Sequence, residues 1–402
     1  MKYQVTLFLV FFAVGLMAQI PVDVDDEAGV QEVHRILVEK GKTLFDYKDF
    51  MAPDEIQTDI NPGEDPEGDY MFRPAFTTDG SKVLVPNGGT DNVTVYDYAS
   101  MTAEAIIEVG EYPCDVATTS EYAVVPCIFD DAIYVIDLSD YSVAATFSTP
   151  AGSQPCVVEV SPDGNYAFVG CDINDQCEVI DLQSLTQLSP VTGFPVSLLS
   201  FSWISTGGRN SFTFTRFEVT SDGSHLIVGD ADNSVLFIDP LSGAIDYTVS
   251  DIPNCFTIGL SGDGEHTIAL SDFNNVFNAY QIDNATHAVT ATVTLTGSAL
   301  ATHDVVANMD GSKAFVGIGN NSSAIVRFES ADFVIFTQTY TPFWMGISAD
   351  HQYAVSGQFR FSIMDFESET MVDQYQGYSQ SFGCVSPVAN EVMSFDPLRY
   401  EG

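Results

Sequence analysis

The amino-acid sequence predicts an all-β protein made of short strands that repeat along the chain. Three observations support this prediction. A phrase of four apolar strands recurs about every 40–47 residues, most copies carry an Asp-Gly pair between their first two strands, and essentially no segment has helical apolar spacing. Asp-Gly between apolar runs favours a tight hairpin, because glycine readily adopts the positive φ of such a turn. Four short strands per repeat of this length are typical of the blades of a β-propeller.

The clearest copies are FRPAFTTDGSKVLVPNGGTDNVTVYDY from Phe72, CVVEVSPDGNYAFVGCDINDQCEVIDL from Cys156 and FTRFEVTSDGSHLIVGDADNSVLFIDP from Phe214. Phrases such as VSPDGNYAFVG followed by VID resemble the YVTN-type propeller repeats of secreted bacterial proteins, related to WD40 repeats. The Gly-His and Trp-Asp signature of WD40 repeats themselves is missing from the sequence. The resemblance implies a fold and does not imply an activity.

The number of blades follows from the innermost strands, if the strands of each repeat are named A to D from the central axis outward. Eight A-strands are expected, beginning near Phe72, Cys114, Cys156, Thr213, Cys255, His303, Phe343 and Phe382. Only a B-strand follows the last of them, whereas TLFDYKDFMAPDEIQTDI from Thr43 aligns with the C and D strands from Thr94. We therefore expect residues 43–402 to form eight blades, the last shared by both ends of the chain, since a closed ring leaves no exposed sheet edge. Seven blades is the alternative.

Before the repeats, residues 1–18 have the pattern of a secretory signal: Lys2, an apolar stretch, and Ala18 as a cleavage residue. A membrane anchor is the alternative, although the apolar stretch is short for a span. Residues 19–42 form an acidic N-terminal segment, and no later window holds 18 consecutive apolar residues. The mature protein is therefore expected to be periplasmic or extracellular, without a transmembrane segment.

The charge composition excludes one class of partner. The 402 residues contain 13 Lys plus Arg against 56 Asp plus Glu, giving a net charge of −43, while 45% of residues are hydrophobic and can fill a large core. A field of this sign repels phosphates, so nucleic acid is not an expected partner. The scarcity of bases also suits a protein that works in high salt, where screening relieves self-repulsion.

Many acids are expected to serve the turns of one rim by accepting hydrogen bonds from nearby backbone N–H groups. In the A–B turns they are Asp79, Asp163, Asp222, Asp263, Asp310 and Asp350, and in the C–D turns they are Asp46, Asp97, Asp137, Asp181, Asp239, Asp283, Glu329 and Asp365. The opposite rim carries the B–C and D–A loops. Carboxylates and amide oxygens there suit a hard cation such as Ca²⁺, and the candidate ligands are Asp172, Asn174, Asp175, Asp230 and Asp232. Solvated turn residues are the alternative.

The B–C and D–A loop rim is also the expected ligand face. An insertion at about 189–211 joins a D-strand to the next A-strand and places Trp203 and Arg209 over this rim as a lid or partner-binding element, unless it is an inert loop. His303, Asp304 and Trp344 open further A-strands on the same rim. A catalytic His303–Asp304 pair is not expected, because neighbours on a strand point to opposite faces.

Seven cysteines occur in a chain expected to be exported, where disulfides can form. Cys114 and Cys127 are equidistant from one A–B turn, and Cys156 and Cys171 from the next. Directly opposite positions bring Cβ atoms within about 4.5–5.5 Å, a little wider than the roughly 3.5–4.5 Å of a disulfide, so two cross-hairpin disulfides are predicted with local adjustment of the backbone. Cys177 competes for Cys171, and buried free thiols are the alternative.

The sequence contains no GxSxG, HExxH or phosphate-binding glycine loop. This favours a binding or scaffold module that takes a protein or glycan at the loop rim. The alternative is an enzyme, because YVTN-like propellers resemble lactonase and quinoprotein dehydrogenase propellers, with a divalent metal at the channel mouth. No catalytic set of those enzymes can be matched residue by residue, so this alternative rests on fold analogy.

Overall fold

The structure is a computed structural model, and it describes residues 73–99, 102–173, 175–195, 217–230, 233–273, 276–295, 304–318, 322–337, 344–348, 350–357, 360–376, 382–385 and 392–395. The expected signal at 1–18, the acidic segment at 19–42 and the strands from Thr43 lie outside these ranges. The described residues contain no helix that is long and apolar enough to cross a membrane.

The described strands form eight antiparallel sheets in chain order. Sheet 1 contains β1 (Ala75–Phe76), β2 (Lys82–Asn87), β3 (Asn92–Asp97) and β4 (Thr102–Glu108). Sheet 2 contains β5 (Ala117–Thr118), β6 (Tyr122–Cys127), β7 (Ala132–Asp137) and β8 (Val143–Ser148). Sheet 3 contains β9 (Pro155–Val160), β10 (Tyr166–Cys171), β11 (Gln176–Asp181), β12 (Thr186–Gln187) and β13 (Val191–Thr192). Sheet 4 contains β14 (Phe217–Val219), β15 (Leu226–Asp230), β16 (Ser234–Ile238) and β17 (Ile245–Ser250).

The second half of the chain repeats this arrangement. Sheet 5 contains β18 (Cys255–Leu260), β19 (His266–Phe273), β20 (Val276–Asp283) and β21 (Ala288–Leu295). Sheet 6 contains β22 (Val305–Ala307), β23 (Lys313–Ile318), β24 (Ser322–Arg327) and β25 (Asp332–Thr337). Sheet 7 contains β26 (Trp344–Ile347), β27 (Tyr353–Gly357), β28 (Arg360–Asp365) and β29 (Thr370–Gln376). Sheet 8 has β30 (Phe382–Val385) and β31 (Val392–Phe395). The prediction of an all-β chain of repeated four-stranded antiparallel sheets is confirmed.

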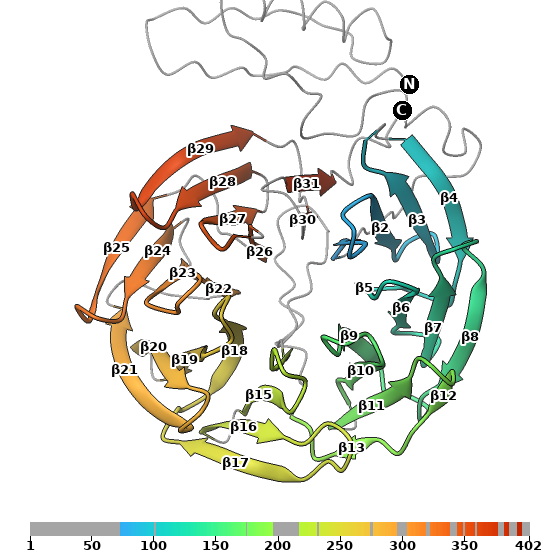
Figure 1. Ribbon diagram of the computed structural model, residues 1–402, viewed down its shortest axis with the longest axis horizontal. Coiled ribbons are helices and arrows are strands. Elements are labelled where there is room, and N and C mark those ends of the chain that lie inside the picture. The colour runs from blue at the N-terminus through green and yellow to red at the C-terminus, as the bar shows by residue number, and fades with distance from the viewer. Residues whose placement is uncertain are drawn as a thin grey trace, which may run out of the picture.

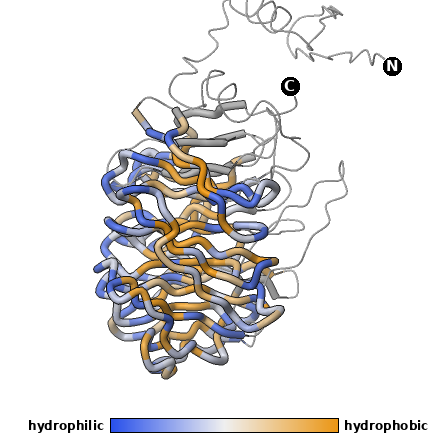
Figure 2. Tube along the Cα trace, turned by 90° about the vertical axis from the view of Figure 1, so that its right-hand side faces the viewer, coloured by the Kyte–Doolittle hydropathy of each residue, from blue (hydrophilic) through white to orange (hydrophobic). Residues whose placement is uncertain are grey.

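The sheets are arranged around a common centre, with the first strand of each sheet innermost and the last outermost (Figure 1). Each innermost strand contacts the innermost strand of the next sheet, and β30 contacts both β26 and β1. Buried apolar clusters join neighbouring sheets, and hydrophilic segments of the chain follow the edges of the disc (Figure 2). The two middle strands are therefore the most buried, whereas outer strands such as β8 and β17 are largely exposed.

The hairpin turns between the first two strands are built as the sequence predicts. In six of the described repeats a turn aspartate accepts a hydrogen bond from the backbone N–H two residues later; these aspartates are Asp79, Asp163, Asp222, Asp263, Asp310 and Asp350. The C–D turns follow the same chemistry at Asp137, Asp181, Asp239, Asp283 and Asp365. Asp97 instead accepts a hydrogen bond from the Lys82 ammonium at 2.7 Å, and Asp46 lies outside the described residues.

The boundary of the predicted insertion at about 189–211 needs correction. Residues 191–192 form β13, which pairs with β11 and so completes the outer edge of sheet 3. Phe194 is fully buried, and its N–H donates to the Asp175 carbonyl at 2.8 Å. The pattern of the outer strand is obscured in the sequence because Pro190 interrupts the strand between β12 and β13.

Neither predicted disulfide is present in the structure, because Cys114, Cys127, Cys156 and Cys171 are all buried free thiols. The physical reason is the register of the hairpins. Pro113 rather than Cys114 lies opposite Cys127, and Pro155 rather than Cys156 lies opposite Cys171 after a β-bulge. A shift of one residue places the two sulfurs on opposite faces of the sheet.

We expect the buried thiols to resist alkylation in the native protein. Burial raises the pKa of Cys171 and of Cys255 to about 12. At pH 8 the thiolate fraction is then more than ~1000-fold below that of an ordinary cysteine, so these residues should react with iodoacetamide only after unfolding. Peptide mapping by mass spectrometry without reduction checks this. A linked peptide containing Cys114 and Cys127 would contradict the free-thiol structure.

Candidate functional site

The B–C and D–A loops, where the sequence predicts ligands, are tied together by backbone hydrogen bonds. The Phe129 N–H donates to the Glu111 carbonyl at 3.2 Å, and the Ile173 N–H donates to the Ser153 carbonyl at 3.2 Å. These two pairs are equivalent, because each joins a residue of the B–C loop to the D–A loop that enters the same sheet. The loops of sheets 2 and 3 therefore form a defined surface at this rim.

Acids on this rim hold the loops in place. The Asp131 carboxylate accepts hydrogen bonds from the backbone N–H groups of Gly152 at 2.6 Å and Gln154 at 3.1 Å. Asp91 does the same for the Tyr112 N–H at 2.9 Å. Asp91 and Asp131 also have positive φ, of 56° and 46°, a conformation that aspartate tolerates better than most residues. Part of the acidity on this rim is thus explained by loop geometry.

The predicted calcium ligands are only partly described. Asn174 and Asp232 lie outside the described residues, whereas Asp172, Asp175 and Asp230 lie within them. Within the described ranges, no group of three or more His, Cys, Asp or Glu side chains could hold a metal ion. The described residues therefore provide no support for the calcium site.

The predicted ligand-binding residues are also described only in part. Trp203, Arg209 and His303 lie outside the described residues, and of Trp344 only the backbone, at the start of β26, is described. Asp304 is 6% exposed, and its carboxylate accepts hydrogen bonds from the backbone N–H groups of Val305 at 3.0 Å and Met345 at 2.9 Å. It thus connects β22 to β26, and in this structure it has a structural role.

Asp115 forms the same kind of connection between sheets 2 and 3, and the sequence analysis missed it. Its carboxylate accepts from the backbone N–H groups of Val116 at 2.9 Å and Val158 at 3.1 Å. It also forms an ion pair with Arg73 of sheet 1 at 3.3 Å. The signal was present in the sequence, because Asp115 and Asp304 both follow the first residue of an expected A-strand.

Two exposed apolar side chains stand on the loop rim at equivalent positions of neighbouring sheets. Phe129 is 48% exposed and Ile173 is 59% exposed, and each lies two residues after the cysteine that ends its second strand. The Phe129 ring lies 4.9 Å from the Tyr112 ring, between centroids. Exposed apolar residues on loops commonly mark a binding surface, so Phe129 and Ile173, with the half-buried Tyr112 beside Phe129, are the candidates on this rim.

The surroundings of these apolar residues are acidic. Among the described residues between 83 and 312 there is no lysine or arginine, although acids occur throughout. Glu111 and Asp130 are exposed next to Tyr112 and Phe129. A partner at this face would therefore meet negative charge around an apolar centre.

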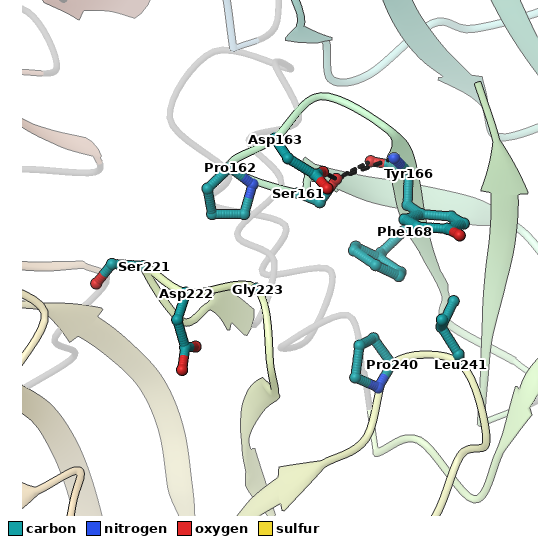
Figure 3. A pocket seen from close by; sticks show the side chains of 10 residues that line it. All are labelled: Ser161, Pro162, Asp163, Tyr166, Phe168, Ser221, Asp222, Gly223, Pro240 and Leu241. Carbon is teal, nitrogen blue, oxygen red and sulfur yellow. Dashed lines mark hydrogen bonds between the residues drawn. The ribbon is translucent and has the colours of Figure 1, made fainter. Parts of the chain in front are cut away.

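A cavity of about 380 Å³ lies on the opposite rim, between sheets 3 and 4 (Figure 3). It is lined by the turns at Ser161–Asp163 and Ser221–Gly223, by Tyr166 and Phe168 of β10, and by Pro240 and Leu241 of the turn after β16. The sequence analysis assigned this rim to structural turns alone. The Asp-Gly turns of this rim look alike in the sequence, and the glycine in the turn after β16 was not singled out, so the cavity was not predicted.

The comparisons with known proteins agree with the fold and leave the activity open. No protein-family model and no curated protein matches the chain. In structure the chain is similar to hydrazine synthase of Kuenenia stuttgartiensis, a β-propeller-containing protein, with a TM-score of 0.53 and 16% identity over 82% of this chain and 96% of that one. In all, 1662 chains of solved structures are similar, so the arrangement is too widespread to indicate an activity. At this level of identity the likeness supports a propeller-like fold alone.

Proposed function

We propose that the chain is an exported propeller of eight blades, related to the YVTN-type repeats, that binds a protein or glycan through its B–C and D–A loop rim. In this proposal β30 and β31 form the inner half of the eighth blade, and the strands expected from Thr43 complete it. The contacts of β30 with both β26 and β1 support this arrangement. Export is inferred from residues 1–18 of the sequence.

The binding function rests on one observation, the exposed Phe129 and Ile173 and the half-buried Tyr112 on hydrogen-bonded loops. Little ordering is needed when such loops bind, so little conformational entropy is lost. Aromatic residues at the centre of a contact often supply most of the binding energy. Because the surrounding side chains are acidic, a partner that presents basic groups around an apolar segment fits this face best.

We expect the double variant Phe129→Ser/Ile173→Ser to lose binding at least about tenfold, because two apolar anchors are removed from the centre of the face. The measurement is binding of the purified protein to arrays of basic peptides and of glycans, followed by titration of the positive probes. The matched control is Ile245→Ser, which removes an equally exposed apolar side chain, 54% exposed, from the outer strand β17.

Two outcomes would overturn this proposal. The first is equal loss of binding in the Ile245→Ser control. The second is the absence of any bound peptide or glycan together with chelator-sensitive hydrolysis of a lactone, which would favour the enzymatic alternative with a divalent metal.

A further inference from the structure

The junction of sheets 3 and 4, which contains the cavity, differs from other junctions in the C–D turn of sheet 4. In each C–D turn that is fully described, one residue has a φ between 50° and 70°. It lies four residues after the residue that ends the third strand, or four residues after Asp239 in sheet 4, where β16 ends one residue earlier. These residues are Tyr141, Leu185, Gly243, His287, Ala331 and Glu369. The position faces the preceding sheet, and Gly243, in sheet 4, is the one glycine among the described turns.

At four of the other five turns the side chain at this position contacts the preceding sheet, whereas Ala331 is exposed. The Tyr141 hydroxyl donates to Glu104 of sheet 1 at 2.7 Å. Glu369 forms an ion pair with Lys313 of sheet 6 at 2.7 Å. Leu185 packs against the apolar cluster shared by sheets 2 and 3. Gly243 offers no such side chain to the junction of sheets 3 and 4.

The junction of sheets 4 and 5 shows what the missing side chain would occupy. There the His287 ring stacks on Tyr247 at 3.5 Å and lies 6.3 Å from His225, between centroids. In sheet 3 the residue equivalent to His225 is Tyr166, since each follows a turn glycine by two residues. Tyr166 lines the cavity together with Pro240 and Leu241, which belong to the same turn as Gly243.

A side chain at Gly243 would be held at a φ of 70°, which L residues rarely adopt, but the equivalent turns hold Tyr141, Leu185 and His287 at φ between 50° and 61°. A Cβ atom placed there would lie 3.5 Å from Val191, which is an ordinary contact distance. Val191 belongs to the same apolar cluster as Phe168, and Tyr166 packs at its edge. A large side chain at position 243 would therefore extend beside the apolar cluster that borders the cavity.

The walls of the cavity combine apolar surfaces with uncompensated negative charge. The buried Phe168 ring lies 6.5 Å from the Tyr166 ring, between centroids, and Pro240 and Leu241 line the same cavity (Figure 3). Asp163 and Asp222 come from the two hairpin turns, and no lysine or arginine lines the cavity.

Hydrogen bonds keep both carboxylates charged. The pKa of Asp163 is lowered most by a hydrogen bond from the Ser161 hydroxyl and next by one from the Asn165 backbone N–H. The pKa of Asp222 is lowered most by a hydrogen bond from the Ser224 backbone N–H and next by one from the Ser224 hydroxyl. All of these donors are neutral groups, so they stabilise the negative charges without cancelling them.

We propose that this cavity binds a small organic cation in which an ammonium group is joined to an apolar ring. The ring would lie against Tyr166, Phe168 and Pro240, and the ammonium group would be attracted by Asp163 and Asp222. Tyr166 adds a cation–π contribution, because the face of an aromatic ring carries partial negative charge. An anionic ligand is disfavoured by the same two carboxylates. This site is separate from the loop rim and does not depend on the function proposed for that rim.

The test uses phenethylammonium as the cation and 2-phenylethanol as its neutral counterpart, titrated into the full mature chain by calorimetry. We expect binding of the cation at least about tenfold tighter than of the alcohol. The double variant Asp163→Asn/Asp222→Asn should remove most of this preference, since each exposed ion pair contributes about fivefold or less. Equal affinity for the cation and the alcohol would overturn the proposal.

Gly243→Tyr should fill the cavity and abolish binding of the cation. The matched control is Ala331→Tyr, which introduces the same side chain at the same turn position between sheets 5 and 6 and should leave binding unchanged. Circular dichroism and thermal melting verify that both variants fold. Retained binding in a folded Gly243→Tyr variant, or no binding of the cation to the native protein up to about 5 mM, would contradict the assignment. If Gly243→Tyr fails to fold, the double asparagine variant decides alone.

Discussion

Replacing Asp115 with alanine is expected to lower the free energy of unfolding by about 3 kcal/mol. Asp115 is 3% exposed, and its carboxylate accepts the Val158 N–H of the next sheet at 3.1 Å and pairs with Arg73 of the preceding sheet at 3.3 Å. Hydrogen bonds to charged groups contribute about 1.5–3 kcal/mol each, and loss of the acceptor leaves a buried N–H without a partner. One substitution thus weakens the connections among three consecutive sheets.

Urea unfolding followed by circular dichroism measures this loss. Asp115→Asn should lie between the native protein and the alanine variant, because its amide oxygen still accepts one hydrogen bond but carries no charge. The matched control is Asp140→Ala, which removes an exposed carboxylate that accepts the Ser142 N–H at 3.0 Å. An Asp115→Ala loss no larger than that of the control would show that the carboxylate does not connect the sheets.

The local features of the fold could be predicted because they depend on short-range chemistry. Asp163 and Gly164, for example, define a turn whose geometry depends on residues within three positions of it. The order of strands within each sheet follows from such turns, because a short hairpin loop makes two consecutive strands pair with each other. Repetition of the same pattern then predicted the all-β arrangement of four-stranded sheets.

The features that the sequence did not predict depend on deviations of one residue. The bulge between Gly170 and Cys171 shifts the pairing, so that counting outward from the turn placed Cys156 and Cys171 opposite each other incorrectly. The cavity depends on how the turns of sheet 4 meet those of sheet 3, which no local pattern reports. The role of Asp304 is similar, because its partner Met345 lies 41 positions away.

Replacing Phe194 with alanine is expected to lower the free energy of unfolding by about 3–4 kcal/mol, the usual range for a fully buried phenylalanine. Phe194 is 0% exposed and packs edge-on against Phe217 of sheet 4, with ring centroids 5.2 Å apart. Removing the ring leaves a cavity in the apolar cluster that joins sheets 3 and 4.

This prediction distinguishes the observed end of sheet 3 from the insertion expected at about 189–211. In an inert surface loop, loss of the ring would change the free energy of unfolding by less than about 0.5 kcal/mol. Urea unfolding of Phe194→Ala beside Leu188→Ala provides the comparison, because Leu188 is 36% exposed on the same outer edge and should lose little. Similar small decreases in the free energy of unfolding of both variants would indicate that residue 194 belongs to the predicted insertion. A large loss in Phe194→Ala alone would place the end of the blade after Phe194, because only a side chain packed between two sheets creates such a cavity.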